Sequence, residues 1–125
     1  TYVLSAGKYE DYYLRAQRVR QRVCEDFEEA YKKVDVILTP TTANVAFKIG
    51  ENITDPLAMY LQDVFTVTTN LAGLPAISVP VGLSTNGLPI GMQFMGPALS
   101  EERLFQFAYF IERCANFPIL GGIVS

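Results

Sequence analysis

The sequence predicts an α/β fold on three observations. Both ends of the chain carry apolar residues at helical spacing, the middle carries short apolar runs bounded by proline and glycine, and no internal repeat is present. Of the 125 residues, 50% are hydrophobic and 18% are charged, and the mean hydropathy is +0.19. This composition is too apolar for a disordered chain and sufficient for a packed core. The expected order is helix, strand, helix, hairpin, helix.

The first expected element is a long amphipathic helix over residues 8–33. Apolar side chains recur there at spacings of three and four, which predicts one buried stripe. The stripe comprises Tyr9, Tyr12 or Tyr13, Ala16, Val19, Val23, Phe27, Ala30 and Val34. Four arginines between positions 15 and 22 are compatible with an RNA-facing patch. The acidic cluster at 25–29 follows one turn later, and it favours a solvated face with i,i+4 ion pairs.

The middle of the chain predicts a strand, a loop and a second helix. Residues 34–38 form a short apolar run, which Thr39-Pro40 is expected to end. Residues 41–54 contain turn-forming side chains and predict a loop. Asp55-Pro56 then gives an aspartate N-cap with proline at the first helical position, and apolar residues continue at helical spacing as far as Phe65.

A hairpin is expected next. Residues 76–81 predict a buried strand, Asn86-Gly87 favours a tight turn, and residues 88–95 predict the returning strand.

The last expected element is a helix capped by Ser100, with Glu101 and Glu102 in its positively polarised first turn. Phe117-Pro118 is expected to end this helix. Its predicted buried face comprises Leu104, Phe107, Ala108, Ile111 and Cys114 or Ala115.

Composition excludes several kinds of function. The chain has no histidine, which removes mechanisms that need an imidazole base and metal sites that need a histidine ligand. Two cysteines, Cys24 and Cys114, cannot form a four-cysteine zinc site or a disulfide framework, and we expect buried, reduced thiols of a cytoplasmic protein. A net charge of −3 gives no support to polyanion binding.

The ends of the sequence suggest a piece of a longer protein. The chain opens with Thr1, its first methionine is Met59, and the opening residues lack the features of a signal peptide. Prolines and glycines interrupt the apolar stretch 56–100, so we expect no membrane span there. The stretch is too apolar for a small domain to cover alone, which also points to missing chain.

Asp63 is the only charged residue between Pro56 and Ser100. A carboxylate in apolar surroundings is costly unless it is paired. Three interpretations follow: Asp63 lies at an exposed helix end, it pairs with a structural arginine, or it faces a cavity that holds a cationic ligand group. Sequence spacing alone leaves all three open.

No motif supplies a catalytic site. The nucleophile elbow, the phosphate loop and the dinucleotide fingerprint are all absent from the sequence. Ser78 falls inside a predicted strand with no base nearby in sequence. We therefore predict no catalytic residue and no metal site in these 125 residues.

Several separate runs, in order, resemble the C-terminal part of amidase-signature enzymes. The runs are Asp35-Val36-Ile37-Leu38-Thr39-Pro40-Thr41, Ala46-Phe47-Lys48-Ile49-Gly50-Glu51, Asp55-Pro56-Leu57-Ala58-Met59-Tyr60 with Asp63, Phe65-Thr66, Asn70-Leu71-Ala72-Gly73-Leu74-Pro75-Ala76 and Gly87-Leu88-Pro89-Ile90-Gly91-Met92-Gln93. The resemblance covers roughly residues 1–115. The second and third runs are similar to the glutamine-hydrolysing branch of the family, which acts with tRNA.

This resemblance implies that residues 1–125 are a C-terminal segment of an amidase domain with an α/β/α fold, helices surrounding a mixed sheet. Its Lys–cis-Ser–Ser triad and its arginine for the substrate carboxylate would lie upstream, so the segment alone is expected to be inactive. In this branch the aspartate matching Asp63 contacts the α-ammonium of glutamine, which makes Asp63 the predicted substrate-binding residue.

The resemblance also implies partners. The branch works in the cytoplasm with B and C subunits, releases ammonia from glutamine, and amidates glutamate mischarged on tRNA(Gln). ATP and Mg²⁺ would be used by a partner subunit, and the segment itself would bind no cofactor. The alternatives are a different amide hydrolase of the family and a non-catalytic α/β interaction domain. An upstream Gly/Ser-rich signature preceded by a lysine would favour the enzyme.

Overall fold

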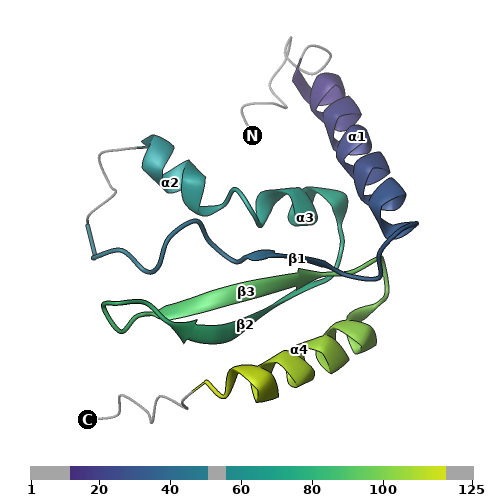
Figure 1. Ribbon diagram of the computed structural model, residues 1–125. Helices are drawn as coiled ribbons and strands as arrows, with labels where there is room; N and C mark the ends of the chain where they lie inside the picture. The colour runs from purple at the N-terminus through teal and green to yellow at the C-terminus, as the bar shows by residue number, and fades with distance from the viewer. Residues whose placement is uncertain (1–11, 51–55, 118–125) are drawn as a thin grey trace.

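The computed structural model describes residues 12–50 and 56–117, and it confirms the α/β expectation. Figure 1 shows α2 and α3 on one side of a small sheet, α4 on the other side, and α1 extending from one end. In chain order the elements are α1 (Leu14–Tyr31), β1 (Ile37–Pro40), α2 (Pro56–Gln62), α3 (Val67–Ala72), β2 (Ala76–Leu83), β3 (Pro89–Met95) and α4 (Glu101–Ala115).

The sheet has the order β1-β3-β2, so β3 is central and both of its neighbours are antiparallel to it. The predicted hairpin of β2 and β3 is confirmed, with residues 84–88 as its loop. Pro40 and Pro80 both lie in edge strands, where a missing N–H leaves no gap inside the sheet. The three described strands contain no parallel pair of the kind that a mixed sheet includes.

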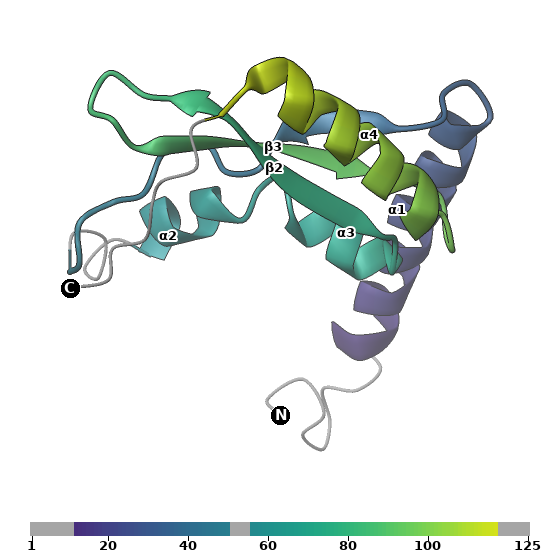
Figure 2. The same cartoon turned by 90° about the horizontal axis from the view of Figure 1, so that it is seen from below.

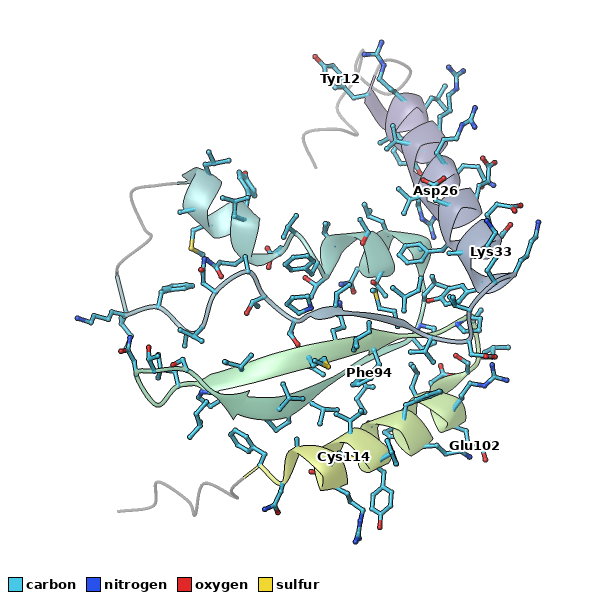
Figure 3. The ribbon with its side chains drawn as sticks, in the orientation of Figure 1. Tyr12, Asp26, Lys33, Phe94, Glu102 and Cys114 are labelled. Carbon is cyan, nitrogen blue, oxygen red and sulfur yellow. The ribbon has the colours of Figure 1, made fainter. Side chains whose placement is uncertain are left out.

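The hydrophobic core lies between the sheet and α4. Val79, Phe94, Leu104 and Ala108 are buried together, and partly buried apolar side chains pack around them. Figure 2 shows α4 lying across β2 and β3, and Figure 3 shows Phe94 between the sheet and this helix. These residues come from alternate positions of the strands and from positions four apart on α4, so one face of each element forms the core.

The first helix departs from its predicted buried stripe. Positions 8–11 lie outside the described residues, and α1 contains no fully buried residue. Val23, Phe27 and Ala30 are half-buried, whereas Val19 is 58% exposed. The reason is that α1 packs on α3, a helix of only six residues, which cannot cover the whole stripe. The charged face is exposed as predicted, but the ion pair of Arg22 and Glu25, at 3.7 Å, has i,i+3 spacing rather than the expected i,i+4 spacing.

The first strand lies later in the chain than expected. The prediction was Val34–Leu38, but β1 is Ile37–Pro40, and Val34 is exposed. Val34 instead continues the end of α1, because its N–H donates to the Ala30 carbonyl at 3.1 Å. Thr39 and Pro40 belong to the strand rather than ending it, since β1 is an edge strand that tolerates proline.

The expected middle helix is divided in two. The helix α2 begins at Pro56, as predicted, and Asp55 lies outside the described residues. It ends at Gln62, and a turn over residues 63–66 separates it from α3. Gly73 ends α3 in the left-handed conformation, with φ of 71°, which a residue with a side chain adopts only with strain.

The last helix is largely as predicted, with two corrections. Ser100 occupies the N-cap position, but its hydroxyl donates to the Pro97 carbonyl at 2.6 Å and makes no side-chain cap bond. Of the expected buried face, Leu104 and Ala108 are buried, whereas Phe107 and Cys114 are exposed. The prediction of two buried thiols is therefore wrong for Cys114, and Cys24 is only partly buried.

Candidate substrate-binding site

Asp63 lies immediately after α2, and its side chain is exposed. This is the first of the three interpretations that the sequence left open. The second does not apply among residues 12–50 and 56–117, where no ion pair involves Asp63. An exposed carboxylate is accessible to a cationic group that arrives from solution.

The backbone of the turn at residues 63–66 is held by hydrogen bonds that converge on one carbonyl. The Asp63 carbonyl accepts from the N–H of Thr66 at 3.0 Å and from the N–H of Val67 at 2.9 Å. The Thr66 hydroxyl donates to the same oxygen at 3.2 Å. The Asp63 N–H in turn donates to the Tyr60 carbonyl at 3.2 Å. These local bonds define the direction in which the Asp63 side chain leaves the backbone.

Gln93 connects this turn to the sheet. It lies on the central strand β3, and its residue is only 5% exposed. Its side-chain Nε2 donates to the Phe65 carbonyl at 2.9 Å and to the Thr39 Oγ1 at 3.2 Å. An amide NH₂ has two hydrogens, so both are used. The buried polar group is thereby satisfied, which a buried amide requires.

The same face of the sheet carries a second polar contact. Thr41 Oγ1 and Ser78 Oγ lie 2.6 Å apart across the position of Gly91 on β3. A Cβ added at Gly91 would meet these two oxygens at 2.8 and 3.0 Å, so only glycine leaves room for the pair. Ser78 lies within a strand, as predicted, and its nearest polar partner is another hydroxyl rather than a base.

A cavity of about 460 Å³ lies beside α2. It is bounded by the loop after β1, by α2 and by the β2–β3 loop, and Gln62, the residue before Asp63, lines it. The other lining residues are Asn44, Val45, Ala46, Phe47, Lys48, Ala58, Leu61, Asn86 and Leu88. Asp63 itself is not among them, so this cavity and the carboxylate are neighbours rather than one pocket.

A second cavity, of about 400 Å³, lies between α1 and the end of α3. Cys24, Phe27 and Tyr31 are on its α1 side. The Tyr31 hydroxyl is buried without a hydrogen-bond partner, and burial raises the pKa of this phenol above its usual value of 10.0. The charged residues Glu28 and Lys32 also line this cavity, and the Cys24 thiol donates to the Ala72 carbonyl at 3.9 Å rather than to a base.

Two further findings concern the described part of the chain alone. Over residues 12–50 and 56–117, no three histidine, cysteine, aspartate or glutamate side chains gather closely enough to hold a metal ion. Within the same ranges no helix is both long and apolar enough to cross a membrane.

The sequence predicted Asp63 as a substrate-binding residue, which stays a prediction, but it did not identify the contact that links the turn of Asp63 to the sheet. Gln93 was identified from the sequence only as the end of a family motif. The signal was present in the alternation of β3, where Gln93 interrupts the apolar residues Met92, Phe94 and Met95. A single amide in such a run predicts a buried polar partner. Which partner it finds depends on residues 28 and 54 positions away.

Comparison with known proteins assigns the family. The amidase family model matches residues 1–105, which is most of the chain, and the chain therefore belongs to the amidase family. Among similar curated proteins, the A subunit of glutamyl-tRNA(Gln) amidotransferase from Maricaulis maris is 58% identical over 117 residues, 94% of this chain. The protein of the same name from Nostoc punctiforme is 53% identical over 125 residues, the full length of this chain.

Solved structures give the same result. The crystal structure of the A subunit of glutamyl-tRNA(Gln) amidotransferase from Thermotoga maritima is similar over 90% of this chain, with a TM-score of 0.80 and 48% identity. The allophanate hydrolase of Kluyveromyces lactis is more distant, at 28% identity and a TM-score of 0.72 over 90% of this chain. The chain spans 24% of the Maricaulis and Thermotoga proteins, 26% of the Nostoc protein and 18% of the hydrolase.

Proposed function

We propose that this chain is a segment of the A subunit of a glutamyl-tRNA(Gln) amidotransferase. The complete protein would hydrolyse glutamine and supply the ammonia that converts Glu-tRNA(Gln) to Gln-tRNA(Gln). The observation that carries this proposal is the 58% identity, over 94% of the chain, to the Maricaulis protein of that name. Its similarity in sequence and structure to the Thermotoga protein supports the same assignment.

In this proposal Asp63 binds the α-ammonium of glutamine. Its carboxylate is exposed on a turn whose backbone is fixed by several hydrogen bonds. A carboxylate and an ammonium form a charge-assisted hydrogen bond, which is shorter and stronger than a neutral one. Glutamine is distinguished from simple amides by this ammonium, so a carboxylate at this place would confer selectivity for an amino-acid amide.

The remaining parts of the reaction are assigned to other regions. The nucleophile and its lysine–serine partners would lie in the part of the amidase domain that precedes these residues. B and C subunits would complete a cytoplasmic heterotrimer, and a partner subunit would bind ATP, Mg²⁺ and tRNA. We therefore expect the isolated 125-residue chain to release no ammonia from glutamine.

The proposal is tested by Asp63→Asn in the complete protein with its partner subunits. Asparagine keeps the shape of aspartate and removes its charge. If the complete protein encloses the bound ammonium, we expect the fall in kcat/KM for glutamine to correspond to about 2–4 kcal/mol, the range for truncating a partly desolvated charge pair. Glutaramate, which is glutamine without its α-amino group, never uses the charge and should lose much less. The measurement is kcat/KM for both substrates.

Asp26→Asn provides the matched control. Asp26 is an exposed aspartate on α1, a different element from the turn, and is labelled in Figure 3. The same chemical change at Asp26 should leave both kcat/KM values unaltered. Equal losses on glutamine and glutaramate in Asp63→Asn would contradict the role of Asp63 and would make it a structural residue.

A second candidate is an amide hydrolase of the same family with another substrate. This candidate is supported by allophanate hydrolase, which has a similar fold at 28% identity and whose name gives a different substrate. The two candidates are separated by the glutaramate comparison. An amide hydrolase that does not recognise an α-ammonium should have a higher kcat/KM for glutaramate than for glutamine. Asp63→Asn should leave that ratio unchanged.

A further inference from the structure

The turn that carries Asp63 is fixed internally, but its position over the sheet needs a separate explanation. The bonds from Thr66 and Val67 to the Asp63 carbonyl lie within the turn and at the start of α3. They set the turn's shape, and they would persist if the whole turn moved relative to the sheet. A carboxylate that recognises a ligand held elsewhere must also be fixed relative to the rest of the domain.

Two side-chain bonds from β3 provide this link. Gln93 Nε2 donates to the Phe65 carbonyl at 2.9 Å, within the turn itself. The Thr69 hydroxyl donates to the Met95 Sδ at 2.6 Å, one turn further along on α3. The first bond reaches a residue two positions from Asp63, and the second reaches a residue six positions away. Gln93 is therefore the closer of these two anchors.

Thr39 fixes the orientation of the Gln93 amide. Its Oγ1 accepts the second amide hydrogen at 3.2 Å, and β1 pairs Thr39 directly opposite Gln93. An amide with both hydrogens accepted cannot rotate without breaking one bond. Because Gln93 is only 5% exposed, water cannot easily replace either partner. The three residues thus form a rigid connection from β1 through β3 to the turn.

We propose that Gln93 is a positioning residue for ligand recognition by Asp63. It acts by holding the Phe65 carbonyl, and through it the turn at residues 63–66, at a fixed place over the sheet, with Thr39 orienting its amide. This inference rests on the proposed role of Asp63 in binding the α-ammonium of glutamine. It adds a second residue, Gln93, which touches no substrate and whose loss should weaken recognition of that ammonium.

The test is Gln93→Met in the complete protein with its partner subunits. Methionine has a similar length and no donor, so the Phe65 carbonyl loses its partner while the volume stays similar. We expect kcat/KM for glutamine to fall about tenfold, mainly through KM, as for the loss of one buried hydrogen bond. For glutaramate the change should stay below about threefold. Thr39→Val, a milder change, should give a smaller loss with the same selectivity.

A double mutant separates positioning from general damage. If Gln93 acts through Asp63, Gln93→Met should cause little further loss of glutamine activity in an Asp63→Asn background, because no charge remains to be positioned. Thr69→Val provides a comparison, since it removes a bond to β3 that lies six positions from Asp63 and outside the turn. We expect Thr69→Val to lower the melting temperature and to affect both substrates alike.

The outcomes are distinguishable. Suppose that Asp63→Asn lowers kcat/KM selectively for glutamine. If Gln93→Met then lowers kcat/KM equally for both substrates, or if its effect adds fully to that of Asp63→Asn, the positioning role is wrong and the proposed function stands. If Asp63→Asn itself shows no selectivity, both proposals fail. If Gln93→Met does not fold, Thr39→Val decides: an equal effect on both substrates overturns the positioning role.

Discussion

On the α4 side of β3, Phe94 and Met92 enter an apolar cluster with Leu104 and Ala108. On the opposite side, which faces α2 and α3, Gln93 makes two hydrogen bonds, and Gly91 leaves room for a pair of hydroxyls. One strand therefore presents an apolar face to α4 and, apart from the buried Met95, a polar face to the other helix layer.

The two faces have different physical consequences. Apolar contacts are non-directional, so burial against α4 stabilises the fold without fixing one side chain to one place. Hydrogen bonds depend on distance and angle, so the polar face places particular backbone groups, among them the Phe65 carbonyl. Stability should therefore depend mainly on the α4 face, and positional precision on the α2–α3 face.

The largest expected effect is on the isolated 125-residue chain, because its described helices expose large apolar side chains. On α4, Phe105, Tyr109 and Phe110 are each more than 60% exposed, and on α2 Tyr60 is 74% exposed. Such surface promotes association. We expect aggregation in light scattering, or binding of a hydrophobic dye as in loosely packed states. A monodisperse monomer with a sharp cooperative melt would contradict this expectation.

Next in size is Phe94→Ala, which tests the apolar face. Phe94 is 4% exposed, and removing its ring leaves a cavity among Val79, Leu104 and Ala108. We expect a loss of about 3–5 kcal/mol in the free energy of unfolding, measured by urea denaturation of the complete protein. Phe94→Leu should lose clearly less. The protein that remains folded should keep the same ratio of kcat/KM for glutamine and glutaramate. A selective loss for glutamine would show that the apolar face also positions the site.

Gly91→Ala should have a smaller effect, on the polar face. The new methyl group would meet the Thr41 and Ser78 oxygens at 2.8 and 3.0 Å, so the hydroxyl pair must move apart. We expect a destabilisation of about 1–3 kcal/mol, typical of overpacking. The measurement is the shift in the urea midpoint. Adding Thr41→Ala, which removes the closer oxygen, should recover part of the loss. No recovery would mean that the cost arises from the backbone of β3.

The smallest expected effect concerns the ion pair outside both faces. Arg103 Nη1 lies 3.0 Å from Asp35 Oδ1, and both side chains are at least half exposed. Exposed pairs contribute little, so a double-mutant cycle with Arg103→Met and Asp35→Asn should give a coupling below about 1 kcal/mol, decreasing with added salt. A larger coupling that is independent of salt would show that the pair matters as much as the polar face.

Much of the local structure was determined by the sequence alone. The last helix with its two glutamates, the start of α2 at Pro56 and the hairpin around Asn86-Gly87 all follow from residues close together in the chain. The scarcity of charge between positions 56 and 100 also singled out Asp63. These features depend on capping, turn preference and periodicity, which act over a few residues.

Tertiary structure decided the rest. The apolar spacing continued through Phe65, yet the helix stops at Gln62, and the Phe65 carbonyl is taken by Gln93, 28 positions away. The exposure of Val19 likewise depends on how little of α1 the short α3 covers. Local sequence cannot specify these outcomes, because a carbonyl or an apolar side chain accepts many partners. Only the folded arrangement of the strands determines which partner is within reach.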